Sequence, residues 1–229
     1  SGDILFVTPH LTKEKLFYLK CVRIALKSKA KLVVLNFETP NMIKELSPFP
    51  KNPKLWRGTK YLAKYASTVL SISALGNQYA VKYFENGPRF NYVYPGVNSF
   101  AIKPNIQKDP SNKRILIFAR FHDKHKGGDD ILDLLSKRLS GYEIRIMVGC
   151  GYVPTQLLDK LLDKASSSKI NLKFIYRVND YEKFEELSKA NILFYPSYFE
   201  GFGYPPVEAS FCDTPCITYQ NPVMKEVNS

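Results

Sequence analysis

Two glutamates flank a glycine-bearing turn in the last part of the sequence. Glu200 and Glu208 lie in the stretch YPSYFEGFGYPPVEASFCDTPCI, which begins at Tyr195, and seven residues separate them. Carboxylates accept hydrogen bonds from vicinal hydroxyls, which both a ribose and a hexose offer. Gly201 and Gly203 leave backbone amides open to an anion. The stretch therefore carries the groups needed to hold a sugar nucleotide.

The residues before this turn predict a strand. Residues 190–195 (ANILFY) form a short apolar run that ends at Pro196. The loop from Ser197 to Gly203 should therefore leave the C-terminal end of a strand. Open α/β sheets bind their ligands at such ends.

The residues after the turn predict a helix. Pro205 and Pro206 suit the first helical turn, where a missing N–H is tolerated, and we expect Glu208 in that turn. A simpler interpretation is that Glu208 only complements the helix dipole and that Glu200 is a solvated loop charge. For either glutamate taken alone, the two interpretations carry equal weight.

Several ordered motifs resemble one family. The pattern PS-x-x-EGFG-x-x-x-x-E-A, followed by TPCI, resembles the E-x7-E region of glycosyltransferase family 4, the retaining nucleotide-sugar glycosyltransferases of GT-B fold. Upstream, residues 115–132 (ILIFARFHDKHKGGDDIL) resemble a family segment in which a strand is followed by Gly-Arg, a loop, Lys-Gly and a helix. Ala119 stands where the family usually has the Gly of Gly-Arg. Residues 144–151 (IRIMVGCG) resemble its next strand, and residues 92–100 (YVYPGVNSF) its lobe junction. The resemblance covers about residues 68–227.

The resemblance implies a role for individual residues. Arg120 and Lys126 stand in the places of the phosphate-binding Arg and Lys, Glu208 would hold the ribose, and Glu200 the donor sugar. The expected catalytic residues are Arg120, Lys126 and Glu200. The expected donor-binding residues are Arg120, Lys126, Arg177, Val178, Glu200, Gly201, Phe202, Gly203 and Glu208.

The implied reaction is transfer of a hexosyl unit from a nucleotide diphosphate sugar to a hydroxyl acceptor, with retention of configuration. Arg120, Lys126 and the amides near Gly201 would stabilise the departing diphosphate. We expect a UDP- or GDP-sugar donor, a glycan or lipid-linked acceptor and no cofactor. No Asp-x-Asp metal motif occurs in the sequence, so no metal is expected.

Composition favours a compact protein without a membrane span. The chain has 229 residues, 45% of them apolar, and no apolar run approaches the roughly 18 to 20 residues of a transmembrane helix. The start, SGDILFVTPH, lacks a basic signal-peptide region, so a cytoplasmic location is expected. The four dispersed cysteines are interpreted as small core residues of a reduced compartment: Cys21, Cys150, Cys212 and Cys216.

Charge implies an anionic partner. The formal net charge is +12, more than a diphosphate donor requires. The excess predicts peripheral contact with an anionic membrane surface, binding of an anionic glycan, or simple solvation of basic residues at 27–31, 51–60 and 124–126. Nucleic acid is a minor alternative, because no zinc-finger, RNP or helix-turn-helix signature accompanies the charge.

Strand-like runs alternate with helix-length segments, which predicts parallel βαβ units. The expected fold class is α/β and GT-B-like, with two Rossmann-like lobes and a reduced N-terminal lobe. We place the acceptor-side lobe at 1–103 and the donor-binding lobe at 104–229. The expected strands lie near 4–7, 31–37, 68–72, 90–94, 114–119, 143–148, 171–176, 191–195 and 215–218. The expected helices lie near 12–28, 56–66, 74–85, 128–138, 154–167, 180–189 and 204–212.

The first lobe departs from the family pattern. Only about 70 residues precede the segment that resembles a late strand of that lobe, and the family histidine after a first-lobe strand is replaced by Glu38. His10, at the end of ILFVTPH, could face the cleft, but a loop residue with a local hydrogen bond is the favoured interpretation, as it is for His122 and His125. A non-catalytic nucleotide-sugar-binding or partner subunit is therefore the main alternative to an enzyme. A sugar-nucleotide epimerase is a third hypothesis, without a signature of its own.

Overall fold

The computed structural model of the chain describes residues 2–9, 15–49, 51–84, 89–97, 106, 108–109, 111–149 and 151–227. The chain forms two compact units. The first comprises Ser1–Pro95 with Lys225–Val227 and Ser229, and the second Gly96–Met224 with Asn228. The boundary predicted between residues 103 and 104 lies outside the described residues and stays a prediction.

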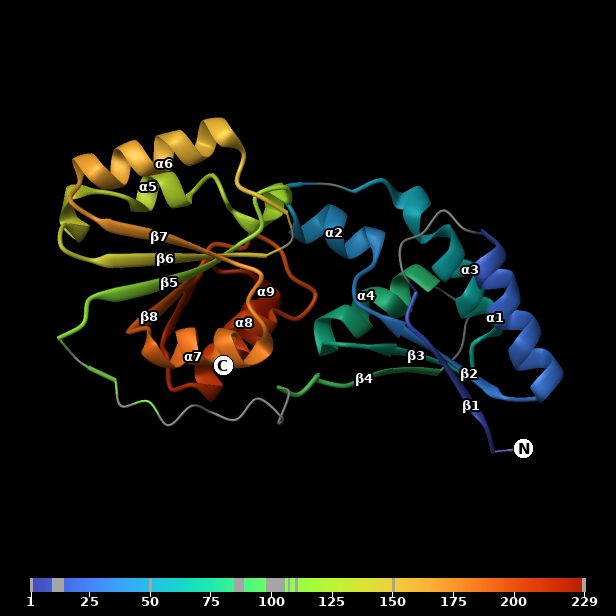
Figure 1. Cartoon of the computed structure of the whole chain (residues 1–229). Helices are drawn as coiled ribbons and strands as arrows, with labels where there is room; N and C mark the ends of the chain where they lie inside the picture. Colours follow the sequence, from blue (N-terminus) through green and yellow to red (C-terminus); the bar gives the residue numbers. More distant parts are fainter. Residues whose placement is uncertain are drawn as a thin grey trace. The chain divides into compact units, whose positions relative to one another are not determined.

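The first unit is built on a parallel sheet in the order β1-β2-β3-β4 (Figure 1). Its strands are β1 (Ile4–Val7), β2 (Lys31–Asn36), β3 (Thr68–Ser71) and β4 (Arg89–Tyr92). Its helices are α1 (Lys15–Ser28), α2 (Pro40–Leu46), the 3₁₀ turn η1 (Pro53–Trp56), α3 (Arg57–Tyr65) and α4 (Ala74–Phe84).

One face of this sheet carries the core of the first unit. Alternate residues of the strands, among them Leu32, Val34 and Val69, are buried against side chains of α1, α3 and α4. The period of two in β2 explains this, because successive side chains of a strand point to opposite faces. The sequence pattern therefore decides which face the helices cover.

A residue far along the chain caps α4. The last helix, α9 (Pro222–Val227), carries Glu226, whose two carboxylate oxygens accept the backbone N–H groups of Ala74 (2.7 Å) and Leu75 (2.8 Å). The first N–H groups of a helix have no partner within it, and a carboxylate there also complements the helix dipole. Glu226 thus completes an element of the first unit.

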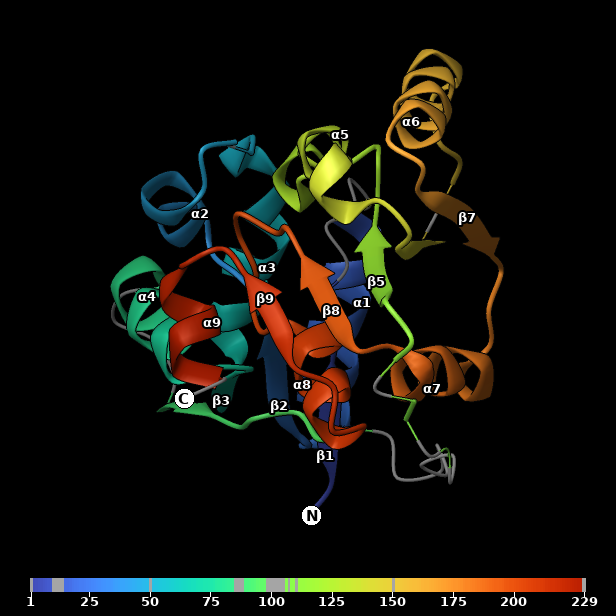
Figure 2. The ribbon, with the colours of Figure 1, turned by 90° about the vertical axis from the view of Figure 1, so that its left-hand side faces the viewer.

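The second unit contains a parallel sheet in the order β7-β6-β5-β8-β9 (Figure 2). Its strands are β5 (Arg114–Ala119), β6 (Glu143–Val148), β7 (Asn171–Tyr176), β8 (Ile192–Tyr195) and β9 (Cys216–Thr218). Its helical segments are η2 (Lys124–Lys126), α5 (Ile131–Leu134), η3 (Lys137–Leu139), α6 (Thr155–Ser167), α7 (Asp180–Lys189) and α8 (Tyr204–Phe211).

Helices cover both faces of the second sheet (Figure 1). Side chains of α5 and α6 pack with Ile117 and Ile146 on one face. Side chains of α7 and α8 pack with Leu116 and Leu193 on the other. Because both faces are covered, the central strands are apolar almost throughout, as expected for a doubly wound sheet.

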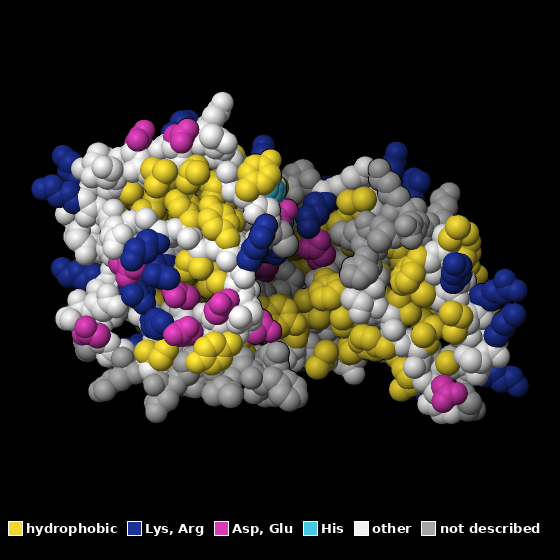
Figure 3. All heavy atoms as spheres, in the orientation of Figure 1, with side chains coloured by type: hydrophobic (Ala, Val, Ile, Leu, Met, Phe, Trp, Pro, Cys, Tyr) yellow, Lys and Arg dark blue, Asp and Glu magenta, His cyan; other side chains and the backbone are white. Residues whose placement is uncertain are grey.

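A network of charges joins the N-terminal parts of β5, β6 and β7 to α7. Glu143 accepts from Arg114 (2.8 Å), Arg145 (3.2 Å) and Lys173 (3.0 Å). Arg145 also pairs with Glu186 of α7 at 2.6 Å. Basic and acidic side chains lie close together on the surface of this unit (Figure 3). Burial alone would raise the pKa of Glu143, but its three cationic partners outweigh burial and lower it to about 2.

Eight of the nine strands agree with the sequence prediction within one residue at each end. Strand β4 ends two residues before its predicted end, and some helices differ more. The helix predicted at 128–138 is wrong for most of its length, because α5 spans only Ile131–Leu134. Leu135 leaves the helix in an extended conformation and is fully buried, so core packing ends the helix early. The short helices α2 and α9 were not predicted. Within the described residues, no helix is both long and apolar enough to cross a membrane.

Candidate active site

The two loops that carry the predicted catalytic residues leave neighbouring strands. The chain runs outward from β5 to β6 and β7 and then returns to β8 on the other side of β5. The loops after β5 and β8 therefore start at the point where the strand order reverses (Figure 2). Doubly wound sheets bind ligands at this position. Lys126 follows β5 and Glu200 follows β8.

The structure brings Lys126 and Glu200 into direct contact. Nζ of Lys126 lies 2.5 Å from Oε1 of Glu200, and the two side chains are only 8% and 10% exposed. The hydroxyl of Tyr195, the last residue of β8, donates a hydrogen bond to the same Oε1. One carboxylate oxygen therefore receives a cation and a neutral donor in a nearly water-free position.

Burial and pairing act in opposite directions on this pair. Burial lowers the pKa of Lys126, the Glu200 carboxylate offsets only part of that effect, and the charge of Arg120 lowers the pKa further. Burial alone would raise the pKa of Glu200, but the charge and hydrogen bonds of Lys126 and Tyr195 outweigh it, so the pKa is lowered. Burial, followed by the charge of Glu200, raises the pKa of Tyr195 well above its usual range. Glu200 is therefore a carboxylate, and Tyr195 keeps its proton.

Backbone contacts hold the two loops together. The N–H of Tyr198 donates to the carbonyl oxygen of His125 at 2.8 Å, and the hydroxyl of Ser197 donates to the same oxygen at 3.3 Å. Gly127 has a left-handed φ of 63°, and a Cβ there would overlap the carbonyl oxygen of Pro196. Glycine at this position permits the close approach that buries Lys126.

The sequence predicted a helix that opens at Gly127, near residues 128–138. In the structure Gly127 instead ends a 3₁₀ turn. Lys126 is the last residue of the 3₁₀ turn η2, and Gly127 follows it as a left-handed cap. The backbone turns back at Gly127, and the Lys126 side chain contacts Glu200 at the C-terminal ends of β5 and β8. Helix α5 begins four residues later, at Ile131.

The loop after β8 ends at a second left-handed glycine. Gly203 has φ of 89°, and a Cβ there would overlap the side chain of Met224. Gly201 is half-buried. Phe202 is buried, with its ring 5.2 Å from that of Tyr204 in an edge-to-face contact. Gly201, Phe202 and Gly203 thus fix the path from Glu200 into α8.

Glu208 lies in the second turn of α8 rather than in the first. It is the fifth residue of the helix and is buried. Its Oε1 accepts from Nζ of Lys183 on α7 at 2.7 Å, and Lys183 also pairs with Asp180 at 3.1 Å. Burial alone would lower the pKa of Lys183, but the hydrogen bonds that Lys183 donates to Glu208 and Asp180, with the charges of these carboxylates, outweigh burial and raise it. Glu208 is therefore a buried, paired carboxylate, and helix-dipole complementarity does not account for it.

Arg120 is the exposed cation of the site. It follows β5 and pairs with Asp123 at 3.2 Å, with both side chains more than 40% exposed. Gly149, at the end of β6, leaves room for the Arg120 side chain, because a Cβ there would crowd Cγ of the arginine. Arg120 lacks a buried partner among the described residues, so its guanidinium is available to an anion.

Arg177 and Val178 follow β7, two strands away from β5. Arg177 is exposed with a left-handed φ of 54°, and Val178 is half-buried. In the described part of the chain, no hydrogen bond or ion pair joins either residue to Lys126 or Glu200. Their predicted contact with a base stays a prediction.

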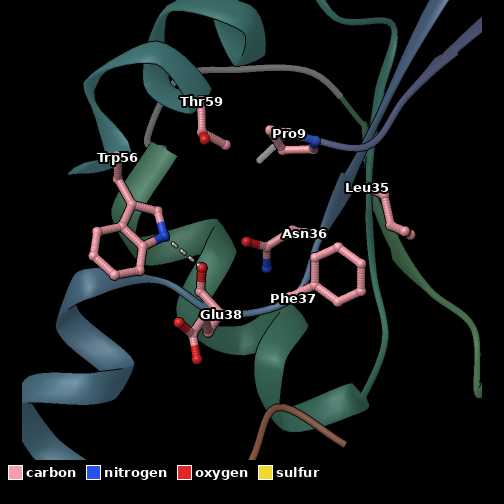
Figure 4. A pocket seen from close by; sticks show the side chains of 7 residues that line it. All are labelled: Pro9, Leu35, Asn36, Phe37, Glu38, Trp56 and Thr59. Atoms are coloured by element: carbon pink, nitrogen blue, oxygen red, sulfur yellow. Dashed lines mark hydrogen bonds between the residues drawn. The ribbon is translucent and has the colours of Figure 1, made fainter. Parts of the chain in front are cut away.

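The first unit has a pocket of about 330 Å³ beside the C-terminal ends of β1 and β2 (Figure 4). It is lined by Pro9, Leu35, Asn36, Phe37, Glu38, Trp56 and Thr59. Trp56 donates its Nε1–H to the backbone oxygen of Glu38, and the Glu38 carboxylate pairs with Lys51 at 2.9 Å. The walls are mainly apolar, with one carboxylate, one amide and one hydroxyl.

Comparisons with known proteins decide the family. The family model for glycosyl transferases group 1 matches residues 99–229, more than half of the chain. The chain belongs to this family. The resemblance to glycosyltransferase family 4 is thereby confirmed, and the matched range includes the site around Lys126, Glu200 and Glu208.

A curated relative is the O-antigen chain mannosyltransferase RfbU of Salmonella typhimurium, 27% identical over 169 residues, which are 73% of this chain and 46% of that protein. Similar solved structures include Anabaena Alr3699/HepE in complex with UDP-glucose (TM-score 0.66, 15% identity, 94% of this chain and 59% of that one). Another is the sucrose-phosphate synthase of Thermosynechococcus elongatus (TM-score 0.68, 14% identity), and the match covers 94% of this chain and 55% of that one. The chain spans about half the length of these proteins. Their fold confirms the predicted GT-B-like fold class.

Sequence reasoning missed two side chains of this glycosyl transferase site. Tyr195 was interpreted only as the end of an apolar strand, and Lys183 was only included in the helix expected near 180–189. A hydroxyl at the end of a buried strand needs a partner, which is a signal that could have identified Tyr195. Lys183 had no such signal, because its pairing with Glu208 depends on how α7 packs on α8.

His125 contributes its backbone carbonyl oxygen to the contact between the two loops, whereas the His122 ring packs edge-to-face on Tyr152. Nε2 of His122 accepts from the N–H of Tyr152 at 3.4 Å, and His10 lies outside the described residues. Cys21 and Cys212 are buried and Cys216 is half-buried; all three are thiols rather than disulfides, and Cys150 is not described. Over the described ranges, no group of three or more His, Cys, Asp or Glu residues is placed to hold a metal ion.

Proposed function

We propose that the chain carries the donor site of a retaining glycosyltransferase, which transfers a hexosyl unit from a nucleotide diphosphate sugar to a hydroxyl acceptor. The observation that carries the proposal is the buried contact between Lys126 and Glu200 where the strand order reverses. A diphosphate needs cations, and a hexose needs a carboxylate for its hydroxyls. The site supplies both groups within one contact.

The roles of the residues follow from charge and position. Arg120 and Lys126 would bind the diphosphate and stabilise the negative charge that grows as the sugar leaves. The amides of Gly201 to Gly203 would add hydrogen bonds there. Glu200 would hold the donor sugar, Glu208 the ribose, and the backbone at Arg177 and Val178 the base. Two observations support these proposed roles: the buried contacts of Lys126, Glu200 and Glu208, and the membership of the chain in the family.

The donor is proposed to be a UDP- or GDP-sugar. The Anabaena structure contains UDP-glucose and the Salmonella relative is named a mannosyltransferase, so glucosyl and mannosyl donors both belong in a test. The two cations and two carboxylates of the site would bind the diphosphate and the hydroxyl groups that these donors share.

The acceptor is proposed to be a glycan or a lipid-linked sugar bound by the first unit. The pocket beside β1 and β2 has apolar walls for the flat face of a sugar ring and polar groups for its hydroxyls. Its volume of about 330 Å³ is within the range of small-ligand pockets. This assignment gives the first unit the acceptor-side role expected from the sequence.

An anionic membrane surface is proposed as a peripheral partner on the cytoplasmic side. Helix α1 contains no acidic residue, and Leu16 and Leu26 are 70% and 66% exposed beside the exposed Lys20, Arg23 and Lys27. Hydrophobic and basic side chains lie together on the surface over α1 (Figure 3). An interfacial helix combines apolar burial with attraction to anionic lipids.

The second candidate is a nucleotide-sugar-binding chain that does not catalyse transfer. The two candidates share donor binding and differ in turnover.

One experiment tests the proposal in two steps. Thermal shift and calorimetry with UDP-glucose, GDP-mannose and ADP-glucose should identify a donor that stabilises the folded chain, because a ligand of the folded state raises its apparent stability. Release of the free nucleotide is then measured with and without candidate acceptors. Binding with acceptor-dependent release supports the enzyme, binding without release supports the second candidate, and absence of all binding rejects both.

A further inference from the structure

Tyr195 and Lys126 share one acceptor atom, Oε1 of Glu200. They differ in kind. Lys126 brings a charge on a flexible side chain, whereas Tyr195 brings a neutral hydroxyl from the end of a strand. The Tyr195 side chain is buried in the core cluster that contains Leu193 and Ala209, so its position is fixed by packing.

The proposed function sets a conflict for Lys126. A bound diphosphate carries more negative charge than Glu200 and would attract the Lys126 ammonium. Glu200, which is about as buried as Lys126, would then lose part of its counter-charge. A buried carboxylate without a partner takes up a proton or turns toward water, and either change would remove its hydrogen bonds to the sugar.

We propose that Tyr195 is a positioning residue that keeps Glu200 ionised and oriented toward the donor sugar when Lys126 engages the diphosphate. This inference rests on the proposed function. The hydroxyl of Tyr195 cannot follow the diphosphate, because its ring is held by β8 and the core. It therefore provides the hydrogen bond that remains after Lys126 has moved its charge.

The chemistry of Tyr195 suits this task. Its hydroxyl remains protonated next to a carboxylate, so it acts as a donor throughout the neutral range. A phenylalanine at the same place would fill the same volume and lose only the hydrogen bond. Tyr195→Phe therefore separates positioning from packing.

The test compares donor and free-nucleotide binding. Tyr195→Phe should raise the donor KM about 10- to 150-fold, the range expected for losing one hydrogen bond to a charged group. The affinity for the free nucleotide should change much less, because the Tyr195 hydroxyl donates to Glu200, the expected ligand of the sugar, and not to the expected ligands of the diphosphate or ribose. The acid limb of the rate profile should move to higher pH, since Glu200 would protonate more easily. Unchanged donor KM and pH profile in Tyr195→Phe would overturn the inference.

Tyr219→Phe is the matched control. The Tyr219 hydroxyl also donates to a carboxylate, Oδ2 of Asp130 at 2.8 Å, in the same unit. Its removal should affect stability and leave the donor KM and the acid limb unchanged. An equal shift in both variants would also overturn the inference, because it would indicate a general loosening of the unit.

A second measurement does not depend on a donor or on turnover. The Glu200 carboxyl is titrated by ¹³C NMR in the wild type, in Tyr195→Phe, in Lys126→Met and in the double variant. The pKa of Glu200 should rise more on Tyr195→Phe in the Lys126→Met background than in the wild type. If Tyr195→Phe leaves this titration unchanged in both backgrounds, Tyr195 does not support the carboxylate. If the titration behaves as expected but no nucleotide sugar binds, the proposed function fails and the Tyr195–Glu200 coupling stands.

Discussion

Lys124 and Lys126 belong to the same 3₁₀ turn but have different surroundings. Lys124 is exposed, whereas Lys126 is buried against Glu200. Two lysines so close in sequence look equivalent in a list of basic residues. The left-handed backbone at Gly127 gives them different surroundings, because it allows Lys126 to contact Glu200 at the C-terminal ends of β5 and β8.

We predict that Lys126→Ala weakens donor binding by about 1.5 to 3 kcal/mol, the usual range for a charged hydrogen bond. Lys124→Ala should change it by less than about 0.5 kcal/mol, as is usual for exposed positions. Calorimetry with the best donor, or with free UDP or GDP, measures both. Equal losses in the two variants would indicate a diffuse basic patch instead of a defined diphosphate site.

We predict that Glu208→Ala weakens donor binding by roughly 1 to 3 kcal/mol without unfolding the chain. Glu208 is buried and held by Lys183, so it is preorganised to accept ribose hydroxyls. Glu185→Ala is the control, because Glu185 forms a comparable lysine pair with Lys189, at 2.6 Å, within α7. Unchanged donor affinity in a folded Glu208→Ala variant would refute the ribose assignment.

At the scale of elements, the sequence was sufficient for the strands and for the loop that carries Glu200. The apolar runs of β5, β6 and β8 are short, rich in branched residues and bounded by turn residues, which is a local signal. The early end of α5 and the pairing of Lys183 depend on packing between elements, and no local pattern contains that information. The pocket in the first unit likewise collects residues from separate segments, Pro9, Asn36 and Trp56 among them.

The charge network around Glu143 links strands β5, β6 and β7, and its stability should depend on pH. The pKa of Glu143 is about 2 in the folded chain and near its usual 4.5 when unfolded. A lowered pKa contributes stability above the unfolded value, and this contribution is lost as the pH falls from about 4.5 to about 2. After allowance for the screening of the partly exposed Lys173, we expect about 1 to 3 kcal/mol.

Glu143→Gln should therefore lower the free energy of unfolding at pH 6 and much less near pH 2.5. Urea unfolding of both proteins at the two pH values measures the difference. Glu182→Gln, an exposed carboxylate of the α7 capping box, serves as the comparison. A destabilisation by Glu143→Gln that stays the same at both pH values would show that packing, and not the charge of Glu143, is responsible.

At the scale of the whole molecule, the net charge of +12 exceeds what a diphosphate site requires. The exposed leucines and basic residues of α1 give part of this charge a defined location. Charge alone does not distinguish a membrane from a nucleic acid. The apolar side chains on the same helix favour the membrane.

We predict that the chain binds vesicles containing anionic phosphatidylglycerol at low salt, and that binding fades as ionic strength shortens the screening length. Co-sedimentation with anionic vesicles, neutral vesicles and duplex DNA measures the preference. Replacing Leu16 and Leu26 by serine should weaken vesicle binding, whereas Leu162→Ser on the exposed side of α6 should not. Absence of binding to anionic vesicles at low salt would leave a soluble acceptor as the better proposal.

The cap that Glu226 places on α4 has a consequence for how the chain folds during synthesis. Its contacts with Ala74 and Leu75 span 152 and 151 residues of sequence. Closing a loop of that length costs about 2 kcal/mol more entropy than closing one a tenth as long. When the four strands of the first unit have left the ribosome, Glu226 has not yet been synthesised, so its contact with α4 cannot have formed. The N-terminal end of α4 therefore stays uncapped until α9 has been translated, so an early element of the first unit is completed only after the second unit has been made.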